Sequence, residues 1–529
     1  MFSHPIAKCL ALLVVLHGGH MLTAQSVASA ARAMRSAIAA LDEKPETGLA
    51  AVAVIGAMAA FDGKPAAAAL LDAASKLAAM AAPIVEKRRK GLASEGGSGR
   101  LKRTRYELRG VDDASVAVAA SLAKLKSKEA LKVMLSRLTD QSSTLPLWLR
   151  LQLAARIAEL PAANMKWRQS SMRGSGKAGA NDTLLALIAT AAGLGPRAGA
   201  KCGNWLSLQS QHSNPDVRRQ AVKALGMIAW APAIELLIAR LGQERGVVHN
   251  ALLDALTVLT GQDPGDSEAS WQAWLKAEGG PFVRGEKPLS QGKASARKKK
   301  SAGNTVVSTY FGIEQAGDSI LYVFDNSLSM KAKVGKVKAR DGASGKAPIT
   351  GPKQETRWDV CKAELKVGLR GLRANQKFSL VSFANKARSF SAGMQPATKE
   401  NVASAIEWID GLKLEFQTNA FDALELAFQI AGRGSEDRYY ASEVDTMFFL
   451  SDGAPTIPNL TRSGITQDDS DRILSAVQRW NALGRIRIHS VGLGLQNRTK
   501  DRNPKGRLWP MIFLKNLAEQ NRGRYVSRR

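Results

Sequence analysis

The spacing of apolar residues changes along the chain. Up to about residue 280, apolar residues recur three and four positions apart, which places them on one face of a helix. Beyond residue 306, short continuous apolar runs alternate with segments of helical spacing. A continuous run of about four to eight apolar residues is typical of a strand buried on both faces. The pattern therefore predicts a multidomain protein with an all-α part followed by an α/β part.

The helical part begins with an alanine-rich segment at residues 31–92. Alanine is the strongest helix former, and Gly63 and Pro65 fit the end of one helix and the first turn of the next. The following residues, 93–110, contain the Gly/Ser-rich stretch "ASEGGSGR". This composition is typical of a flexible linker.

Residues 111–280 contain an internal repeat. Segments 112–138 and 215–241 align without a gap, so that Leu122 matches Leu225. Each copy is predicted to form two helices joined by a tight turn, with an apolar face that a single copy cannot bury. Stacked copies can bury it, which predicts a helical-repeat solenoid. Further helices are expected over residues 145–160, 183–192 and 247–259.

The α/β part is predicted to occupy residues 306–529, after a basic linker at 281–305 that is rich in Lys, Ser and Gly. Its alternation of strands and helices predicts a parallel, doubly wound sheet of the Rossmann-like kind. Ligands of such sheets bind beside the carboxyl ends of the strands, near a topological switch point. Strands are expected over residues 319–325, 377–384, 445–453, 486–494 and 523–527, and helices over residues 358–372, 399–412, 421–431, 468–483 and 510–520.

The N-terminus, residues 1–30, has the features of an export signal. Lys8 precedes a short apolar run, and Ala28-Ser29-Ala30 offers a cleavage site for signal peptidase. The alternative is a buried N-terminal helix, but the apolar run is too short for a stable membrane anchor. No later segment is expected to span a membrane. We therefore expect an exported protein that is periplasmic, extracellular or on the cell surface.

Cysteine use and charge set further limits. If the signal is removed, only Cys202 and Cys361 remain, in different predicted domains, so the fold must rest on packing rather than on disulfides. The net charge of +29 is concentrated at residues 87–90, 297–300 and 331–353. Such charge attracts nucleic acid, anionic lipid or acidic proteins. Because the clusters lie in Gly/Ser-rich stretches, solvated linkers are the simpler interpretation.

Five oxygen-bearing side chains are predicted to meet at one edge of the sheet. Asp325 ends the first strand and is followed by Ser327 and Ser329, and Asp452 follows a later strand. Thr418 lies on a loop just before a helix. Hard oxygen ligands without sulfur or imidazole suit Mg²⁺, Mn²⁺ or Ca²⁺ rather than zinc or copper.

These residues resemble the metal-ion-dependent adhesion site of the von Willebrand factor A (vWA) domain, whose pattern is Asp-x-Ser-x-Ser, then Thr, then Asp. The resemblance implies that the hydroxyls of Ser327, Ser329 and Thr418 contact the ion directly. It implies that Asp325 and Asp452 act largely through bound water. An acidic residue of a partner protein would complete the coordination of the ion.

A second resemblance concerns the helical part. "NPDVRRQAVKALGMIA", within the second copy of the repeat, resembles a HEAT-type repeat, and the following "LTGQDPGDSEASWQAWL" resembles the tail that closes such arrays in some bacterial proteins.

Two features depart from the vWA pattern. Leu328 stands where the family usually has glycine, and the basic insertion 331–357 separates the motif from the first helix.

Enzymatic alternatives lack required residues. A phosphatase of the haloacid dehalogenase type needs an Asp where Ser327 stands, and His489 lies inside a strand, as a core or edge histidine would. We therefore predict a non-enzymatic, metal-dependent protein-binding module on a helical-repeat scaffold. One alternative is RNA binding, because helical repeats joined to a vWA domain also resemble the Ro autoantigen. Another is a passive scaffold whose metal site is blocked by Leu328.

Overall fold

A computed structural model describes most of the chain in two compact units. The first unit comprises Met1–Val85 and Tyr106–Ser301, and the second comprises Glu86–Arg105 and Ala302–Arg529. Residues 86–105 thus belong to the same unit as the C-terminal domain, although they lie in the N-terminal part of the chain. The sequence pattern does not indicate this arrangement. The structure describes residues 24–44, 47–92, 98–140, 143–159, 180–287, 289, 308–334, 355–431, 444–453, 469–495 and 508–528.

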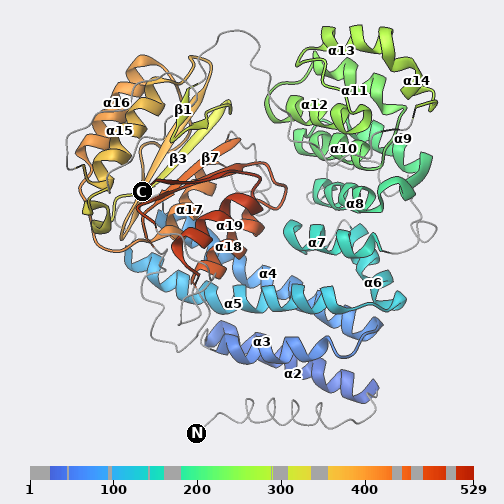
Figure 1. The fold of residues 1–529 in the computed structure, drawn as a ribbon. Helices are drawn as coiled ribbons and strands as arrows, with labels where there is room; N and C mark the ends of the chain where they lie inside the picture. Colours follow the sequence, from blue (N-terminus) through green and yellow to red (C-terminus); the bar gives the residue numbers. More distant parts are fainter. Residues whose placement is uncertain are drawn as a thin grey trace. The chain divides into compact units, whose positions relative to one another are not determined.

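The first unit is helical wherever it is described, as predicted (Figure 1). Helices α4 and α5 each begin or end in the second unit. The helices are α2 (Ala24–Glu43), α3 (Gly48–Met58), α4 (Lys64–Leu92), α5 (Ser98–Lys124), α6 (Lys128–Thr139), α7 (Leu147–Ile157), α8 (Ala180–Leu194), η4 (Gly195–Ala198), α9 (Gly199–Gln209), α10 (Pro215–Met227), α11 (Ala233–Leu241), α12 (Gly246–Thr260), α13 (Glu268–Trp274), η5 (Leu275–Gly279) and α14 (Gly280–Val283).

Each copy of the internal repeat forms two helices, α5 with α6 and α10 with α11. The matched residues Leu122 and Leu225 are both fully buried, as the shared apolar face requires. Asn214 caps α10, since its side chain accepts hydrogen bonds from the first backbone N–H groups and Pro215 occupies the first turn. The assignment to the HEAT type stays a prediction.

Several predicted segments fall partly outside the described residues. Residues 1–23 of the predicted signal are not described, whereas Ala28–Ala30 lies within α2, where Ala30 is buried. Most residues of the predicted basic linker 281–305 are not described either. In the predicted linker 93–110, residues 93–97 are not described, and the rest is helix α5 from Ser98 onward. The predicted linker is therefore helical from residue 98 to residue 110.

No segment after residue 30 was expected to span a membrane, but two later helices meet the criterion of length and apolar composition. Lys64–Leu92 and Asn181–Gln209 are long and apolar enough to cross a membrane by length and composition, a criterion that core helices of soluble proteins also meet. Within the apolar window of the second, 56% is buried.

The second unit is built on a mixed sheet with the order β5-β4-β3-β7-β8-β9, and β6 also pairs with β4. Strands β3, β4, β7, β8 and β9 run parallel, which confirms the predicted doubly wound α/β fold. Separately, β1 and β2 form a small hairpin. The strands are β1 (Thr309–Tyr310), β2 (Ile313–Glu314), β3 (Ser319–Asp325), β4 (Lys377–Phe383), β5 (Ala387–Ser389), β6 (Gln395–Pro396), β7 (Thr446–Ser451), β8 (Arg487–Leu493) and β9 (Tyr525–Arg528).

Alternating residues of β3 face two different apolar layers. Leu321 and Val323 pack against α17 (Ala420–Ile430), α18 (Asp469–Trp480) and α19 (Pro510–Gln520). Ile320, Tyr322 and Phe324 face the other layer, with α15 (Arg357–Arg370) and α16 (Lys399–Gly411) (Figure 1). Because both faces are covered, the strand is apolar at nearly every position until Asp325.

The basic cluster 87–90 is not uniformly solvated. Lys87, Arg89 and Lys90 are exposed, but Arg88 is fully buried and lies over the ring of Phe421, the second residue of α17. Its neighbour Leu92 packs against the same apolar layer of the sheet. The end of α4 is therefore part of the core of the second unit.

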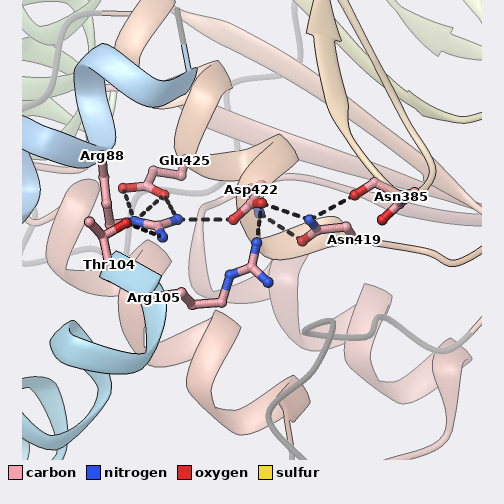
Figure 2. Close-up of polar contacts among 7 residues, drawn as sticks. All are labelled: Arg88, Thr104, Arg105, Asn385, Asn419, Asp422 and Glu425. Atoms are coloured by element: carbon pink, nitrogen blue, oxygen red, sulfur yellow. Dashed lines mark hydrogen bonds and ion pairs between the residues drawn. The ribbon is translucent and has the colours of Figure 1, made fainter. Parts of the chain in front are cut away.

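Arg88 and Arg105 meet two carboxylates of α17 (Figure 2). The Arg88 guanidinium donates to Glu425 and, at 2.9 Å, to Asp422 Oδ1, while Arg105 pairs with Asp422 Oδ2. Burial disfavours the charged guanidinium, but the two carboxylates raise the pKa of Arg88 above its usual value. Two positive and two negative groups thus balance one another out of contact with water.

This ion cluster also holds the loop before α17. Asn419 Nδ2 donates to Asp422 Oδ2 at 2.7 Å and to the Asn385 carbonyl at 3.2 Å, and the Asp422 N–H donates to Asn419 Oδ1 at 3.2 Å (Figure 2). Asn419 follows Thr418 directly. The arginines from the N-terminal part of the chain therefore help to position a loop at the carboxyl edge of the sheet.

Replacing Arg88 with Met should destabilise the second unit by about 3–5 kcal/mol, because two buried carboxylates lose their main partner. Urea unfolding of the full chain, followed by near-UV circular dichroism, measures the change. Arg89→Met is the matched control, since Arg89 pairs with Glu86 in solvent and should change stability by no more than about 0.5 kcal/mol. Equal effects of the two substitutions would contradict the role of the cluster.

Loss of stability in acid should depend on His489 in β8. Burial lowers the pKa of His489 to about 4, and the charges of Arg487 and Arg524 act in the same direction. Its Nδ1 accepts a hydrogen bond from the Arg524 N–H at 3.0 Å, which a proton on Nδ1 would break.

The unfolded chain therefore takes up this proton at higher pH than the folded chain. Between pH ~6.5 and about 4, the free energy of unfolding should fall by roughly 3 kcal/mol on account of this group. In His489→Asn, which keeps an acceptor but does not titrate, that part of the loss should disappear. Denaturant titrations at several pH values compare the two slopes, and parallel slopes would refute the assignment.

Candidate functional site

Two neighbouring parallel strands bring the predicted carboxylates together. β3 pairs with β7 through Phe324 and Leu450, so Asp325 and Asp452 emerge at the same edge of the sheet. Asp325 is fully buried: its Oδ1 accepts from the Ser327 N–H at 2.8 Å and its Oδ2 accepts from Ser451 Oγ at 2.7 Å. These bonds fix the carboxylate between the two strand ends.

The serines of the motif connect the two carboxylates. The chain turns after Asp325 into η6 (Leu328–Lys331), which brings Ser329 back toward β7. Ser327 Oγ lies 2.8 Å from Ser329 Oγ, and Ser329 Oγ donates to Asp452 Oδ1 at 2.7 Å. Four of the five predicted residues are therefore connected by hydrogen bonds and form one oxygen cluster, in which the Ser327 backbone N–H provides the link to Asp325.

Thr418, the fifth predicted residue, lies on the loop that borders this cluster. Ser327 forms an isolated parallel bridge with Glu415, and the Leu328 N–H donates to the Glu415 carbonyl at 2.7 Å. Asn419 N–H donates to the carbonyl of Ala384 at the end of β4, also at 2.7 Å. These contacts place the backbone of Thr418 at the same edge of the sheet.

Burial of two like charges is costly at this edge. Burial raises the pKa of Asp325 to about 7, the negative charge of Asp452 adds to this effect, and hydrogen bonds from Ser327 and Ser451 partly oppose it. A nearby cation would favour the ionised carboxylate. The electrostatics of the cluster are thus suited to a positively charged ligand.

One cationic residue at the site is absent from the predicted set. Arg357, the first residue of α15, donates from Nη1 to Asp452 Oδ2 at 2.7 Å and from Nη2 to the Gly494 carbonyl at 3.3 Å. In the sequence it is one arginine at the end of a long basic insertion, and no local pattern distinguishes it. Only the packing of α15 beside the strand ends brings it to Asp452.

Leu328 does not disrupt the cluster, although it replaces the usual glycine. The two flanking serine hydroxyls are in contact, and Leu328 itself is 37% exposed. Phe416, on the loop beside it, is 75% exposed. The rim of the oxygen cluster therefore offers two apolar side chains to a binding partner.

The donor set would suit a hard divalent cation. It consists of carboxylate and hydroxyl oxygens, without thiolate or imidazole. Among the described residues, no three His, Cys, Asp or Glu side chains gather in a way that could hold a metal ion. An ion at this edge would therefore depend on Ser327 and Ser329 as well as on Asp325 and Asp452. Cys202 and Cys361 are free and buried.

The chain is similar in sequence to inter-alpha-trypsin inhibitor heavy chains. Human inter-alpha-trypsin inhibitor heavy chain H4 is 26% identical over 232 residues, which cover 42% of this chain and 22% of the relative. The pig heavy chain H2 is 28% identical over 160 residues, covering 30% and 15%. The chain thus spans less than a quarter of the length of these relatives.

Similar solved structures include a von Willebrand factor type A protein from Catenulispora acidiphila, at 18% identity and a TM-score of 0.28, covering 40% of this chain and 38% of that one. BatB from Bacteroides thetaiotaomicron matches at 14% identity and a TM-score of 0.26, covering 40% and 90%.

The von Willebrand factor type A domain family matches residues 352–527, a range that holds Thr418 and Asp452 and begins after Ser329. The C-terminal region of this chain therefore has the α/β fold of the vWA domain, and the residues that complete the oxygen cluster precede the matched range.

Proposed function

We propose that the C-terminal domain binds a protein partner through a divalent cation held at the carboxyl edge of β3 and β7. vWA domains commonly mediate protein–protein interactions. The observation that carries the proposal is the continuous contact from Asp325 through Ser327 and Ser329 to Asp452. Side chains from two distant parts of the sequence converge there without any role in the apolar core.

The residues of the cluster would have two roles, to hold the ion and to balance its charge. The hydroxyls of Ser327, Ser329 and Thr418 would hold Mg²⁺, or Mn²⁺ or Ca²⁺ in its place, and the two carboxylates would balance its charge. When bound, the ion supplies an electrophilic position for a carboxylate of the partner. Leu328 and Phe416 on the rim would add apolar contact. The partner segment should thus present an acidic residue next to an apolar one.

Two residues considered for enzymatic mechanisms support a non-enzymatic role. His489, the histidine considered for a catalytic triad, stacks on Phe448 with ring centroids 5.1 Å apart and is 6% exposed. Its environment is that of a structural histidine. A phosphatase of the haloacid dehalogenase type requires an acidic side chain at the position of Ser327, and serine has no carboxyl group. Export to the periplasm, cell surface or extracellular space is proposed on the pattern of residues 1–30 alone.

Titration calorimetry with MgCl₂ or MnCl₂ should detect one binding event per chain. Asp325→Asn and Asp452→Asn should each weaken it by at least about tenfold, because each removes a negative charge that balances the cation. Asp410→Asn is the matched control, since Asp410 is half-exposed on α16 and pairs with Lys366.

Identical binding by the wild type and the Asp325 variant would refute the site. If the wild type fails to bind and Leu328→Gly restores binding, the chain is a scaffold whose cation site is blocked.

RNA binding is the second candidate, favoured by the exposed cations Lys87, Arg89 and Lys90 and by the net charge of +29. Gel-shift titrations with a structured RNA at several salt concentrations distinguish the two functions. Under our proposal, RNA binding should be weak, insensitive to RNA structure and abolished by moderate salt. Tight, structure-dependent binding that persists at about 150 mM salt would favour RNA as the partner.

A further inference from the structure

Backbone contacts hold Arg357 beside the proposed cation site. Its backbone N–H donates to the Ala332 carbonyl at 2.9 Å. The preceding residue, Thr356, caps α15 and forms an isolated antiparallel β-bridge with Lys333. The basic insertion therefore leaves and returns at one point. Arg357 stands at the returning end, with its backbone fixed on one side by the helix and on the other by η6.

Gly494, just after β8, provides the space for the guanidinium. A Cβ atom at Gly494 would lie 2.4 Å from both Nε and Nη2 of Arg357, and the φ angle of +64° also favours glycine. The Asp452 side chain is fully buried and that of Arg357 is 19% exposed. Arg357 Nε is buried without a hydrogen-bond partner. Arg357 thus gives up hydration in order to contact Asp452 and Gly494.

The charge of Arg357 changes the electrostatic balance of the site. A bound divalent cation favours the ionised forms of Asp325 and Asp452, which then contribute −2 to the site, and Arg357 contributes +1. With a divalent cation the site would carry +1, since −2 + 1 + 2 = +1. Because this edge is partly dry, an uncompensated charge is costly. One carboxylate from outside would restore neutrality.

We propose that Arg357 is a resident counter-ion of Asp452 that weakens divalent-cation binding on its own and makes it depend on a carboxylate ligand. The inference rests on the proposed cation site and adds its regulation. The cation and the acidic partner bind cooperatively. Each ligand then raises the affinity for the other by the same factor. A protein of this kind holds its cation tightly only while a partner is bound.

Calorimetric titration of the full chain with MnCl₂ tests this, in sodium acetate and in sodium chloride of equal ionic strength. Acetate stands in for the partner's carboxylate. For the wild type, we expect tighter Mn²⁺ binding in acetate. For Arg357→Gln, which keeps a hydrogen-bond donor without the charge, Mn²⁺ affinity in chloride should rise about tenfold or more, and the acetate effect should shrink.

Three further variants separate charge from structure. Arg357→Lys keeps the charge and should behave like the wild type. Arg373→Gln, which removes an exposed arginine that pairs with Asp318 at the opposite edge of the sheet, should also match the wild type. Gly494→Ala displaces the guanidinium while leaving Arg357 in the chain, and should tighten Mn²⁺ binding as Arg357→Gln does. It therefore tests the inference even if Arg357→Gln fails to fold.

The possible failures are distinguishable. If the wild type binds Mn²⁺ and both Arg357→Gln and Gly494→Ala bind it equally or more weakly, the role of Arg357 is refuted and the cation site stands. If neither the wild type nor any variant binds Mn²⁺ in either salt, the cation site itself is refuted, and the proposed function with it.

Discussion

Two carboxylates at the ends of adjacent, fully buried strands are the constraint on which the second unit depends. Asp325 and Asp452 stand where apolar strands end, and water does not reach Asp325. A carboxylate in such a place must be hydrogen-bonded, paired or protonated. The structure provides the Ser327 and Ser451 donors for Asp325, and Ser329 and Arg357 for Asp452. The loops at this edge are shaped by that requirement.

The same principle appears one layer away, at α17. There Asp422 and Glu425 are buried and are neutralised by Arg88 and Arg105 from the N-terminal part of the chain. Because Asp422 also bonds Asn419, the ion cluster and the Thr418 loop form one hydrogen-bonded system. The second unit, which contains the vWA domain, is therefore not a continuous segment of sequence. Residues 86–105 supply charges without which α17 would carry two unpaired carboxylates in its core.

Several predictions from the sequence agree closely with the structure where the signal was local. The run "SILYVFD" is β3, and residues 510–520 are α19 with Pro510 in its first turn. Short strands such as β5 and β6 were not predicted, since they have only two or three residues and pair antiparallel to β4 through contacts that no periodicity records. Likewise, a Gly/Ser-rich stretch predicted a flexible linker over residues 93–110, whereas helix α5 begins at Ser98.

By itself the sequence determined the elements, the change from helical to α/β pattern, and the oxygen-bearing residues at the strand ends. Periodicity and the residue types at the ends of apolar runs report local burial directly. Only the tertiary structure decided which charges meet. Arg88 and Glu425 are 337 positions apart, and Arg357 and Asp452 are 95 apart, so their pairing depends on how helices pack on the sheet. A basic residue looks the same in the sequence whether it faces water or a buried carboxylate, because charge alone does not encode its partner.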